Sequence, residues 1–345
     1  MRIVDLRSDT VTLPPPAMRK AMYEAELGDD VYGEDPTVNR LEELIAEMTG
    51  KEAGLFAVSG TMGNLVALLT HCGRGTEAIM GNQAHTFLYE AGGVAALGGI
   101  HTHTVPNLPN GMLDPVDVEA AIRAENIHFP RTRVICLENT QNRCGGRVLS
   151  PAQMATIKDV ADRHNIATHL DGARVFNAAV ALGVPVSDIT DQVDTVQVCF
   201  SKGLAAPVGS AICGTADFIQ EARRNRKIVG GGMRQAGVLA AAAIFGLTEM
   251  VDRLADDHAN AKLLAEGIAD VPGLEINLDT VESDIIVFDI DRDGPAQDVA
   301  DAFTAQGVQV NAMGPKTIRA VTHYGIERDD IEYALAVIRH VMGDL

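Results

Sequence analysis

Short apolar segments alternate with helix-like segments along most of the chain. Five of them, AGLFAV, EAIM, VICLEN, IATHLD and TVQVCF, fall at residues 53–58, 77–80, 134–139, 166–171 and 195–200. Short apolar runs bounded by polar segments are typical of buried strands, and their alternation with helices is typical of parallel βαβ units. The pattern therefore predicts an α/β domain with a mainly parallel sheet.

The pattern changes after the helical stretch 233–256. A helix near 257–270 is followed by strand candidates LEINLDT, DIIVFDID, VQVNAM and TIRAVT, with helices at 295–306 and 328–343. Near the start, the prolines at 14–16 favour a helix over 16–26, because proline suits a first helical turn, and a second helix is predicted over 36–49. We therefore expect an arm over 1–15, a large α/β domain over 16–256 and a small α+β domain over 257–345.

Composition and charge exclude several kinds of partner. The chain has 345 residues, 46% of them hydrophobic, and a formal net charge of −19. This charge opposes attraction to nucleic acid or anionic membranes, so neither is expected as a partner. The longest nearly uncharged apolar stretch, residues 236–247, is shorter than the roughly 20 residues of a membrane-spanning helix, and the first residues lack a signal-peptide pattern. We expect a cytoplasmic protein.

The cysteines predict neither disulfides nor a metal site. There are five, an odd number, with no CxxC pair, and most lie in apolar segments. A buried thiol in such a segment behaves as a small hydrophobic side chain. We therefore predict no metal.

The candidate chemistry centres on Lys202 and Asp171, which follow or end two of the predicted strands. A lone lysine is usually solvated and a lone aspartate is usually a helix cap, but the segment FSKGLAAPVGS gives Lys202 few charged neighbours. At adjacent strand ends, a lysine can bind pyridoxal phosphate covalently and a carboxylate can pair with its pyridine nitrogen. The two residues together predict this cofactor.

Other candidate residues are weaker when taken alone. SGTMGN at 59–64 follows a predicted strand and opens a helix, so its N–H groups could bind phosphate, although its glycines suit a tight turn equally well. His85 and His128 could each be ordinary structural histidines. In so acidic a chain, arginines could converge on a carboxylate or phosphate rather than lie on the surface. The candidates are Arg174, Arg234 and Arg319. Arg234 follows three glycines in GGGMRQAG.

Several ordered motifs together resemble the L-threonine aldolases, which belong to fold type I of the pyridoxal-phosphate enzymes and to the β-eliminating lyase superfamily. The resemblance covers residue 5 to about 325, and its motifs are LRSDTVT, GDDVYGEDPTVNRLE, SGTMGNL, ENT with a following GG, HLDGARVFNAA, FSKGLAAPVGS and GGGMRQAG. It implies a pyridoxal-phosphate transferase-like fold. It also implies retro-aldol cleavage of L-threonine or L-allo-threonine to glycine and acetaldehyde.

The resemblance assigns a role to each candidate residue. Lys202 would carry the cofactor, Asp171 would pair with its ring nitrogen and His85 would stack on the ring. Gly60 and Thr61 would bind the phosphate, together with Arg234 from a neighbouring subunit. The residues around the substrate would be Ser8, Arg174 and Arg319 for its carboxylate, His85 and His128 for its β-hydroxyl, and Tyr32 and Glu90 lining the site.

The resemblance also implies a homotetramer built as a dimer of dimers, in which active sites are shared across a dimer interface. One departure is visible, because Ala205 stands in SKGLAAP where many relatives have glycine. An extra methyl group costs little there unless the residue needs a positive φ.

Other functions remain open on the sequence. A related pyridoxal-phosphate lyase could perform β-elimination or cleave a bulkier phenylserine-like substrate, and a non-catalytic protein could bind the cofactor. A nicotinamide dehydrogenase would fit the α/β pattern but requires a glycine fingerprint that is missing from this sequence.

Overall fold

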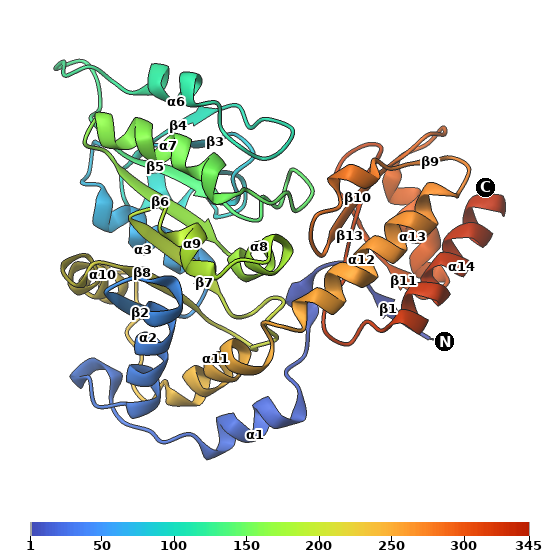
Figure 1. Cartoon of the computed structure of the whole chain (residues 1–345), viewed down its shortest axis with the longest axis horizontal. Helices are drawn as coiled ribbons and strands as arrows, with labels where there is room; N and C mark the ends of the chain where they lie inside the picture. Colours follow the sequence, from blue (N-terminus) through green and yellow to red (C-terminus); the bar gives the residue numbers. More distant parts are fainter. Residues whose placement is uncertain (1, 345) are drawn as a thin grey trace.

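A seven-stranded sheet forms the centre of the larger part of the molecule (Figure 1). The computed structural model describes residues 2–344. The strand order is β2-β8-β7-β6-β5-β3-β4, and β8 alone runs antiparallel to its neighbours β2 and β7. The mainly parallel sheet predicted above is confirmed. The strands are β2 (Ala53–Ala57), β3 (Glu77–Gly81), β4 (His101–Val105), β5 (Thr132–Glu138), β6 (Ala167–Gly172), β7 (Thr195–Cys199) and β8 (Ser210–Gly214).

Helices cover both faces of this sheet. They are α1 (Pro16–Glu24), α2 (Pro36–Thr49), α3 (Gly60–His71), α4 (His85–Leu88), α5 (Gly93–Ala96), α6 (Pro115–Ala121), α7 (Pro151–Arg163), α8 (Val175–Leu182), α9 (Val186–Thr190), α10 (Ala216–Ile228) and α11 (Gly237–Glu249). The predicted helix over 36–49 is confirmed, and its Asp35 cap accepts hydrogen bonds from the N–H groups of Thr37 and Val38. The predicted helix over 16–26 ends two residues earlier than expected, at Glu24.

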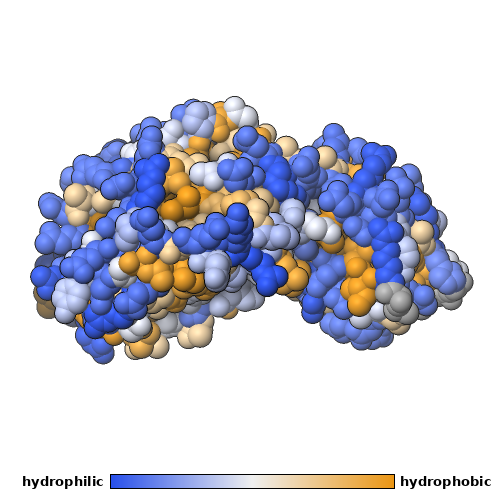
Figure 2. All heavy atoms as spheres, turned by 90° about the horizontal axis from the view of Figure 1, so that it is seen from below, coloured by the Kyte–Doolittle hydropathy of each residue, from blue (hydrophilic) through white to orange (hydrophobic). Residues whose placement is uncertain are grey.

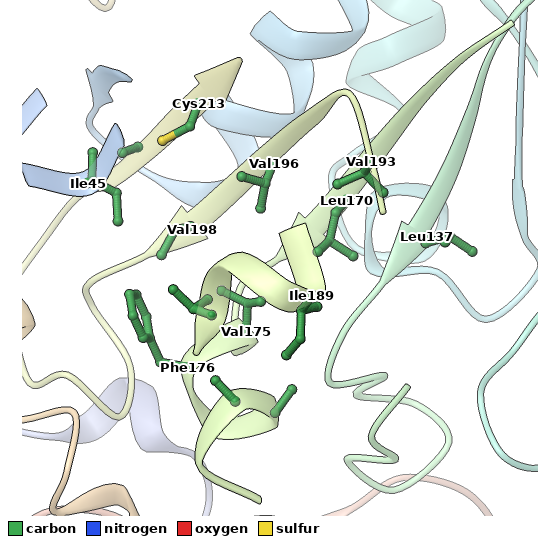
Figure 3. Packing of buried hydrophobic residues seen from close by; sticks show 14 of the residues in the cluster. Ile45, Leu137, Leu170, Val175, Phe176, Ile189, Val193, Val196, Val198 and Cys213 are labelled. Carbon is green, nitrogen blue, oxygen red and sulfur yellow. The ribbon is translucent and has the colours of Figure 1, made fainter. Parts of the chain in front are cut away.

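Alternate residues of the strands pack into different hydrophobic clusters. Val196 and Val198 of β7 point toward Val175 and Phe176 of α8 in the main cluster (Figure 3). In β2, Phe56 packs in the main cluster, whereas its neighbour Leu55 packs with residues of α3 and α10 on the opposite face. Because successive side chains of a strand point to opposite faces, the strands bury side chains on both faces of the sheet.

The C-terminal part has its own sheet and hydrophobic cluster. Its four-stranded antiparallel sheet has the order β12-β13-β10-β9. The elements are α12 (Leu254–Ala269), β9 (Leu274–Glu275), β10 (Ile285–Ile290), α13 (Ala296–Ala305), β11 (Val308–Gln309), β12 (Asn311–Ala312), β13 (Thr317–Val321) and α14 (Arg328–Asp344). The boundary predicted at residues 256–257 falls inside α12.

The N-terminal segment returns to the C-terminal part. Strand β1 (Val4–Asp5) pairs in parallel with β11, and Val4 and Leu6 are fully buried in the C-terminal cluster. The segment then continues through the short 3-10 helix η1 (Asp9–Val11) to α1. It therefore passes between the two parts of the molecule, where Ser8 and Asp9 lie.

The surface carries apolar side chains on the larger part. Figure 2 shows apolar patches among charged ones on the face that includes α1 and α2. Leu13, Tyr23 and Tyr32 are 78%, 91% and 75% exposed. Within residues 2–344, none of the helices combines the length and the apolarity that crossing a membrane requires.

The turn after β7 holds Ala205 in a conformation that favours glycine. Its φ is 60°, its N–H donates to the carbonyl of Lys202 at 2.8 Å, and its side chain is fully buried. A left-handed conformation costs a residue with a Cβ roughly 1–2 kcal/mol. Ala205 thus has the positive φ at which its methyl group is costly.

A pair of substitutions measures this cost. Ala205→Gly should relieve the left-handed strain and so offset the loss of a buried methyl group, whereas Ala206→Gly, at a buried neighbour without a positive φ, should only destabilise. We expect the free energy of unfolding of Ala205→Gly to exceed that of Ala206→Gly by about 1–2 kcal/mol in denaturant titrations. Equal losses would show that Ala205 is not strained.

Candidate active site

Lys202 and Asp171 lie at the carboxyl ends of neighbouring strands. Asp171 belongs to β6, and Lys202 follows the end of β7 at Cys199. In open α/β sheets this edge is where ligands bind. The two residues line an inner pocket whose other residues are Gly60, Thr61, Asn64, His85, Glu90, Ala173, Gln197, Cys199 and Ser201.

An outer pocket adjoins the inner one and shares Lys202 and His85 with it. It lies between the larger part and the C-terminal part, and includes residues from the N-terminal segment. Its other residues are Ser8, Thr10, Tyr89, Asn142, Arg143, Arg174, Asn311, Ala312, Met313 and Arg319.

Two hydrogen bonds hold the carboxylate of Asp171. One oxygen, Oδ2, accepts from Asn64 Nδ2 at 2.9 Å, and the other, Oδ1, accepts from the N–H of Ala173 at 3.1 Å. The residue is buried, so these donors offset the cost of removing the carboxylate from water. They also fix its orientation at the end of β6.

His85 is held by two acidic residues. Its ring nitrogen Nδ1 lies 3.0 Å from Glu90 Oε1, and its backbone N–H donates to Glu138 Oε2 at 2.8 Å. The hydrogen bond to Glu90 raises the pKa of His85 above its ordinary value. Burial raises the pKa of Glu138 to about 7, and repulsion from Asp171 acts in the same direction. Glu138 pairs with Asp171 across β5 and β6, which explains their proximity.

Arg174 crosses from the larger part to the N-terminal segment. Its Nε and Nη2 donate to the two carboxylate oxygens of Asp9 at 2.8 and 2.7 Å. Burial opposes the charge on Arg174, but attraction to Asp9 and Asp284 outweighs it and raises the pKa of the guanidinium. This fork-to-fork geometry fixes the position of the guanidinium beside the outer pocket.

Arg319 reaches the same pocket from β13. Its Nη1 donates to Asn142 Oδ1 at 2.8 Å and its Nη2 donates to the carbonyl of Arg7 at 3.1 Å. Its Nε is buried and has no hydrogen-bond partner among residues 2–344. Burial lowers the pKa of Arg319, and repulsion from Arg174 adds to this shift. The pocket thus has two guanidinium groups at one side, close to Ser8.

The start of α3 offers N–H groups to an anion. Gly60 and Thr61 are its first residues, and N–H groups in a first helical turn have no partner within the helix. A Cβ on Gly60 would lie 2.6 Å from Cys199 Sγ, so the close approach of α3 to β7 requires glycine there. Both features suit a phosphate group at the helix N-terminus.

Comparisons with known proteins identify the family. Residues 5–291 match the family model described as β-eliminating lyase. The chain is 47% identical to low-specificity L-threonine aldolase 1 of Arabidopsis thaliana, over 99% of this chain and 97% of that one. It is 43% identical to low-specificity L-threonine aldolase of Escherichia coli K12, over 95% of this chain and 96% of that one.

The chain belongs to the β-eliminating lyase family. Solved structures at lower identity share the fold. Threonine aldolase of Leishmania major superposes with a TM-score of 0.82 at 20% identity, covering 98% of this chain and 99% of that one. Serine palmitoyltransferase of Sphingomonas wittichii gives a TM-score of 0.77 at 19% identity, covering 99% and 88%. The predicted fold type I is therefore confirmed.

Three of the predicted site residues of this β-eliminating lyase line neither pocket within the single chain. Tyr32 is exposed, and Arg234 pairs with Asp29 at 3.0 Å on the surface. His128 is exposed between α6 and β5. His128 precedes β5 by four positions, and because β5 spans seven residues, the amino end of this strand lies roughly 20 Å from its carboxyl end.

Other polar residues of the site were not predicted. Asn64 follows Gly60 by one helical turn, so the spacing within SGTMGN already places both on one face of α3. Glu138 lies next to the end of VICLEN and Asp171 ends IATHLD, which is a signal that the sequence does contain. Asp9 could not be inferred as the partner of Arg174, because 165 positions separate them.

Behind the inner pocket, His169 should make the stability of the chain depend on pH. Burial lowers the pKa of His169 to about 3 in the folded chain, whereas an unfolded histidine titrates near 6.5. Below about pH 6.5 the unfolded chain therefore binds a proton that the folded chain does not, and stability falls as pH falls.

The variant His169→Gln should lose this contribution. We expect the loss of unfolding free energy between about pH 7 and pH 5 to be smaller in the variant than in wild type by roughly 1–2 kcal/mol, measured on cofactor-free protein. Exposed His128→Gln serves as the control. An identical pH dependence in wild type and His169→Gln would show that folding does not lower the pKa of His169.

Proposed function

We propose that this protein is a pyridoxal-phosphate enzyme that cleaves L-threonine and L-allo-threonine to glycine and acetaldehyde. The observation that carries the proposal is the convergence of Lys202 and Asp171 in one pocket beside the guanidinium groups of Arg174 and Arg319. The names of the relatives from Arabidopsis thaliana and Escherichia coli support threonine as substrate.

The residues of the inner pocket fit the cofactor. Lys202 would hold it covalently, Asp171 would pair with its ring nitrogen, and His85 would stack on the ring. The N–H groups of Gly60 and Thr61 would bind its phosphate. When bound, the cofactor accepts the electron pair released as the Cα–Cβ bond of the amino acid breaks.

The outer pocket would orient the amino acid. Ser8, Arg174 and Arg319 would bind its carboxylate, and the fixed contact between Arg174 and Asp9 holds one of these groups in place. Binding the carboxylate at one side determines which bond of Cα faces the cofactor.

His85 would exchange the proton of the β-hydroxyl group. Because its Nδ1 faces Glu90, Nε2 is the nitrogen that can accept a proton from the substrate side. After the aldehyde leaves, the same nitrogen, or a water molecule near it, would return a proton to Cα, which gives glycine. In this proposal Glu90 acts through the orientation and basicity of His85.

We further propose that the active site is completed by another copy of the chain, in a homotetramer in the cytoplasm. Tyr32, His128 and Arg234 could reach a pocket only from a neighbouring copy. Tyr32 and Arg234 lie together, since the N–H of Asp30 donates to the carbonyl of Arg234 at 3.0 Å. The exposed apolar side chains of Leu13, Tyr23 and Tyr32 would be covered by such an interface.

Lys202→Ala should abolish glycine formation from L-threonine, because no other amine in the pocket can carry the cofactor. Borohydride reduction of wild type should attach the cofactor to the peptide that contains Lys202, as mass spectrometry would show. Lys20→Ala, an exposed control, should behave as wild type. Cofactor trapped on another lysine would contradict the assignment.

Arg234→Ala should weaken retention of the cofactor by about tenfold or more, because the phosphate would lose a charged partner from the neighbouring copy. Equilibrium dialysis of the folded variant measures this directly. Arg224→Ala, another exposed arginine, is the matched control. Equal retention in both variants would argue against a shared site.

A further inference from the structure

A chain of buried polar side chains extends from the inner pocket to the opposite edge of the sheet. It begins at Asn64, which is 1% exposed, and passes through His169 and Thr195, each 2% exposed, to the half-buried His71. Asn64 and His71 are seven residues apart on α3, which places them on one face of that helix. None of these four residues has a role in the reaction proposed above.

Asn64 lies between two acidic residues. Its Nδ2 donates to Asp171 Oδ2 and to Glu90 Oε1, both at 2.9 Å. Asp171, Glu90 and His85 have polar atoms that all lie within 4.8 Å of one another. Two buried carboxyl groups this close repel each other, and the two N–H bonds of one amide group offset this repulsion.

The opposite end of the same amide accepts a hydrogen bond. Asn64 Oδ1 lies 3.2 Å from His169 Nε2, so this nitrogen carries the proton. Burial lowers the pKa of His169 to about 3 and keeps the ring neutral. Its other nitrogen, Nδ1, therefore accepts the hydroxyl hydrogen of Thr195 at 2.9 Å.

The last member of the chain completes this directionality. Thr195 Oγ1 lies 2.8 Å from His71 Nε2 and accepts a hydrogen bond from its N–H. Every donor in this chain thus points toward the inner pocket. Thr195 Oγ1 accepts from His71 and donates to His169, and the carbonyl of Thr168, 3.4 Å away, is a more distant second acceptor for its hydroxyl group. If the amide of Asn64 rotated by half a turn, its oxygen would face two carboxylates and its NH₂ group would face the N–H of His169.

We propose that Asn64 is a positioning residue that orients Asp171 toward the cofactor, and that His169, Thr195 and His71 fix the orientation of its amide group. This inference rests on the proposed binding of pyridoxal phosphate, but not on the identity of the substrate. A carboxylate held against the ring nitrogen keeps that nitrogen protonated. The positive charge on the ring in turn favours loss of other protons from the cofactor.

The test compares cofactor binding in Asn64→Ala and wild type, without substrate. We expect the dissociation constant of pyridoxal phosphate to rise by about tenfold in Asn64→Ala, since Asp171 loses a donor and faces Glu90 directly. We also expect the pH midpoint of the cofactor's visible absorption band to rise by about half a unit or more, because the ring nitrogen is less often protonated.

Thr195 provides a matched pair at the far end of the chain. Thr195→Val removes the hydroxyl group at nearly constant volume, so the proton of His169 is no longer fixed on Nε2. We expect smaller changes in the same direction, whereas Thr195→Ser should restore the wild-type values. Thr190→Val is the control, since Thr190 is also fully buried but donates to the carbonyl of Thr49 and lines neither pocket.

The outcomes separate this proposal from the proposed function. Wild-type affinity and absorption in both Asn64→Ala and Thr195→Val would overturn the positioning role, as would equal changes in Thr190→Val. If Asn64→Ala does not fold, the Thr195 pair decides alone. Failure of wild type to bind the cofactor would contradict the proposed function itself, whereas binding without cleavage of threonine would contradict only the substrate.

Discussion

Acidic side chains are buried along one edge of the parallel sheet, and the cost of burying them constrains the rest of the site. Glu138, the last residue of β5, is in register with Asp171, the next-to-last residue of β6, and Glu90 lies close to Asp171. A buried carboxylate without donors is costly, so each needs hydrogen bonds from groups that the fold holds in place. Asn64, the N–H of Ala173 and the N–H of His85 supply them.

The same requirement operates between the two parts of the molecule. Asp9, on the N-terminal segment, is fully buried and is neutralised by Arg174 of the larger part. Strand β1, close to it in sequence, pairs with β11 of the C-terminal part. The ion pair therefore joins the N-terminal segment, which pairs with the C-terminal part, to the carboxyl edge of the large sheet. It also gives the outer pocket a guanidinium whose position cannot easily change.

Much of this arrangement could be predicted from the sequence, because local patterns determine it. The strands that end in Asp171 and precede Lys202 are short apolar runs, and parallel strands bring such ends to one edge. Strand β8 was not predicted, since SAICG has no distinctive pattern and pairs antiparallel between β2 and β7. The positive φ of Ala205 was also beyond prediction, because it depends on how the turn after β7 closes.

Cleavage of threonine with pyridoxal phosphate is the reaction that this site should perform. The most direct measurement incubates purified protein and added cofactor with L-threonine and with L-allo-threonine, and quantifies glycine and acetaldehyde. We expect equal amounts of glycine and acetaldehyde from at least one of the two substrates. Bound cofactor without either product, or pyruvate or an aromatic aldehyde from other amino acids instead, would contradict it.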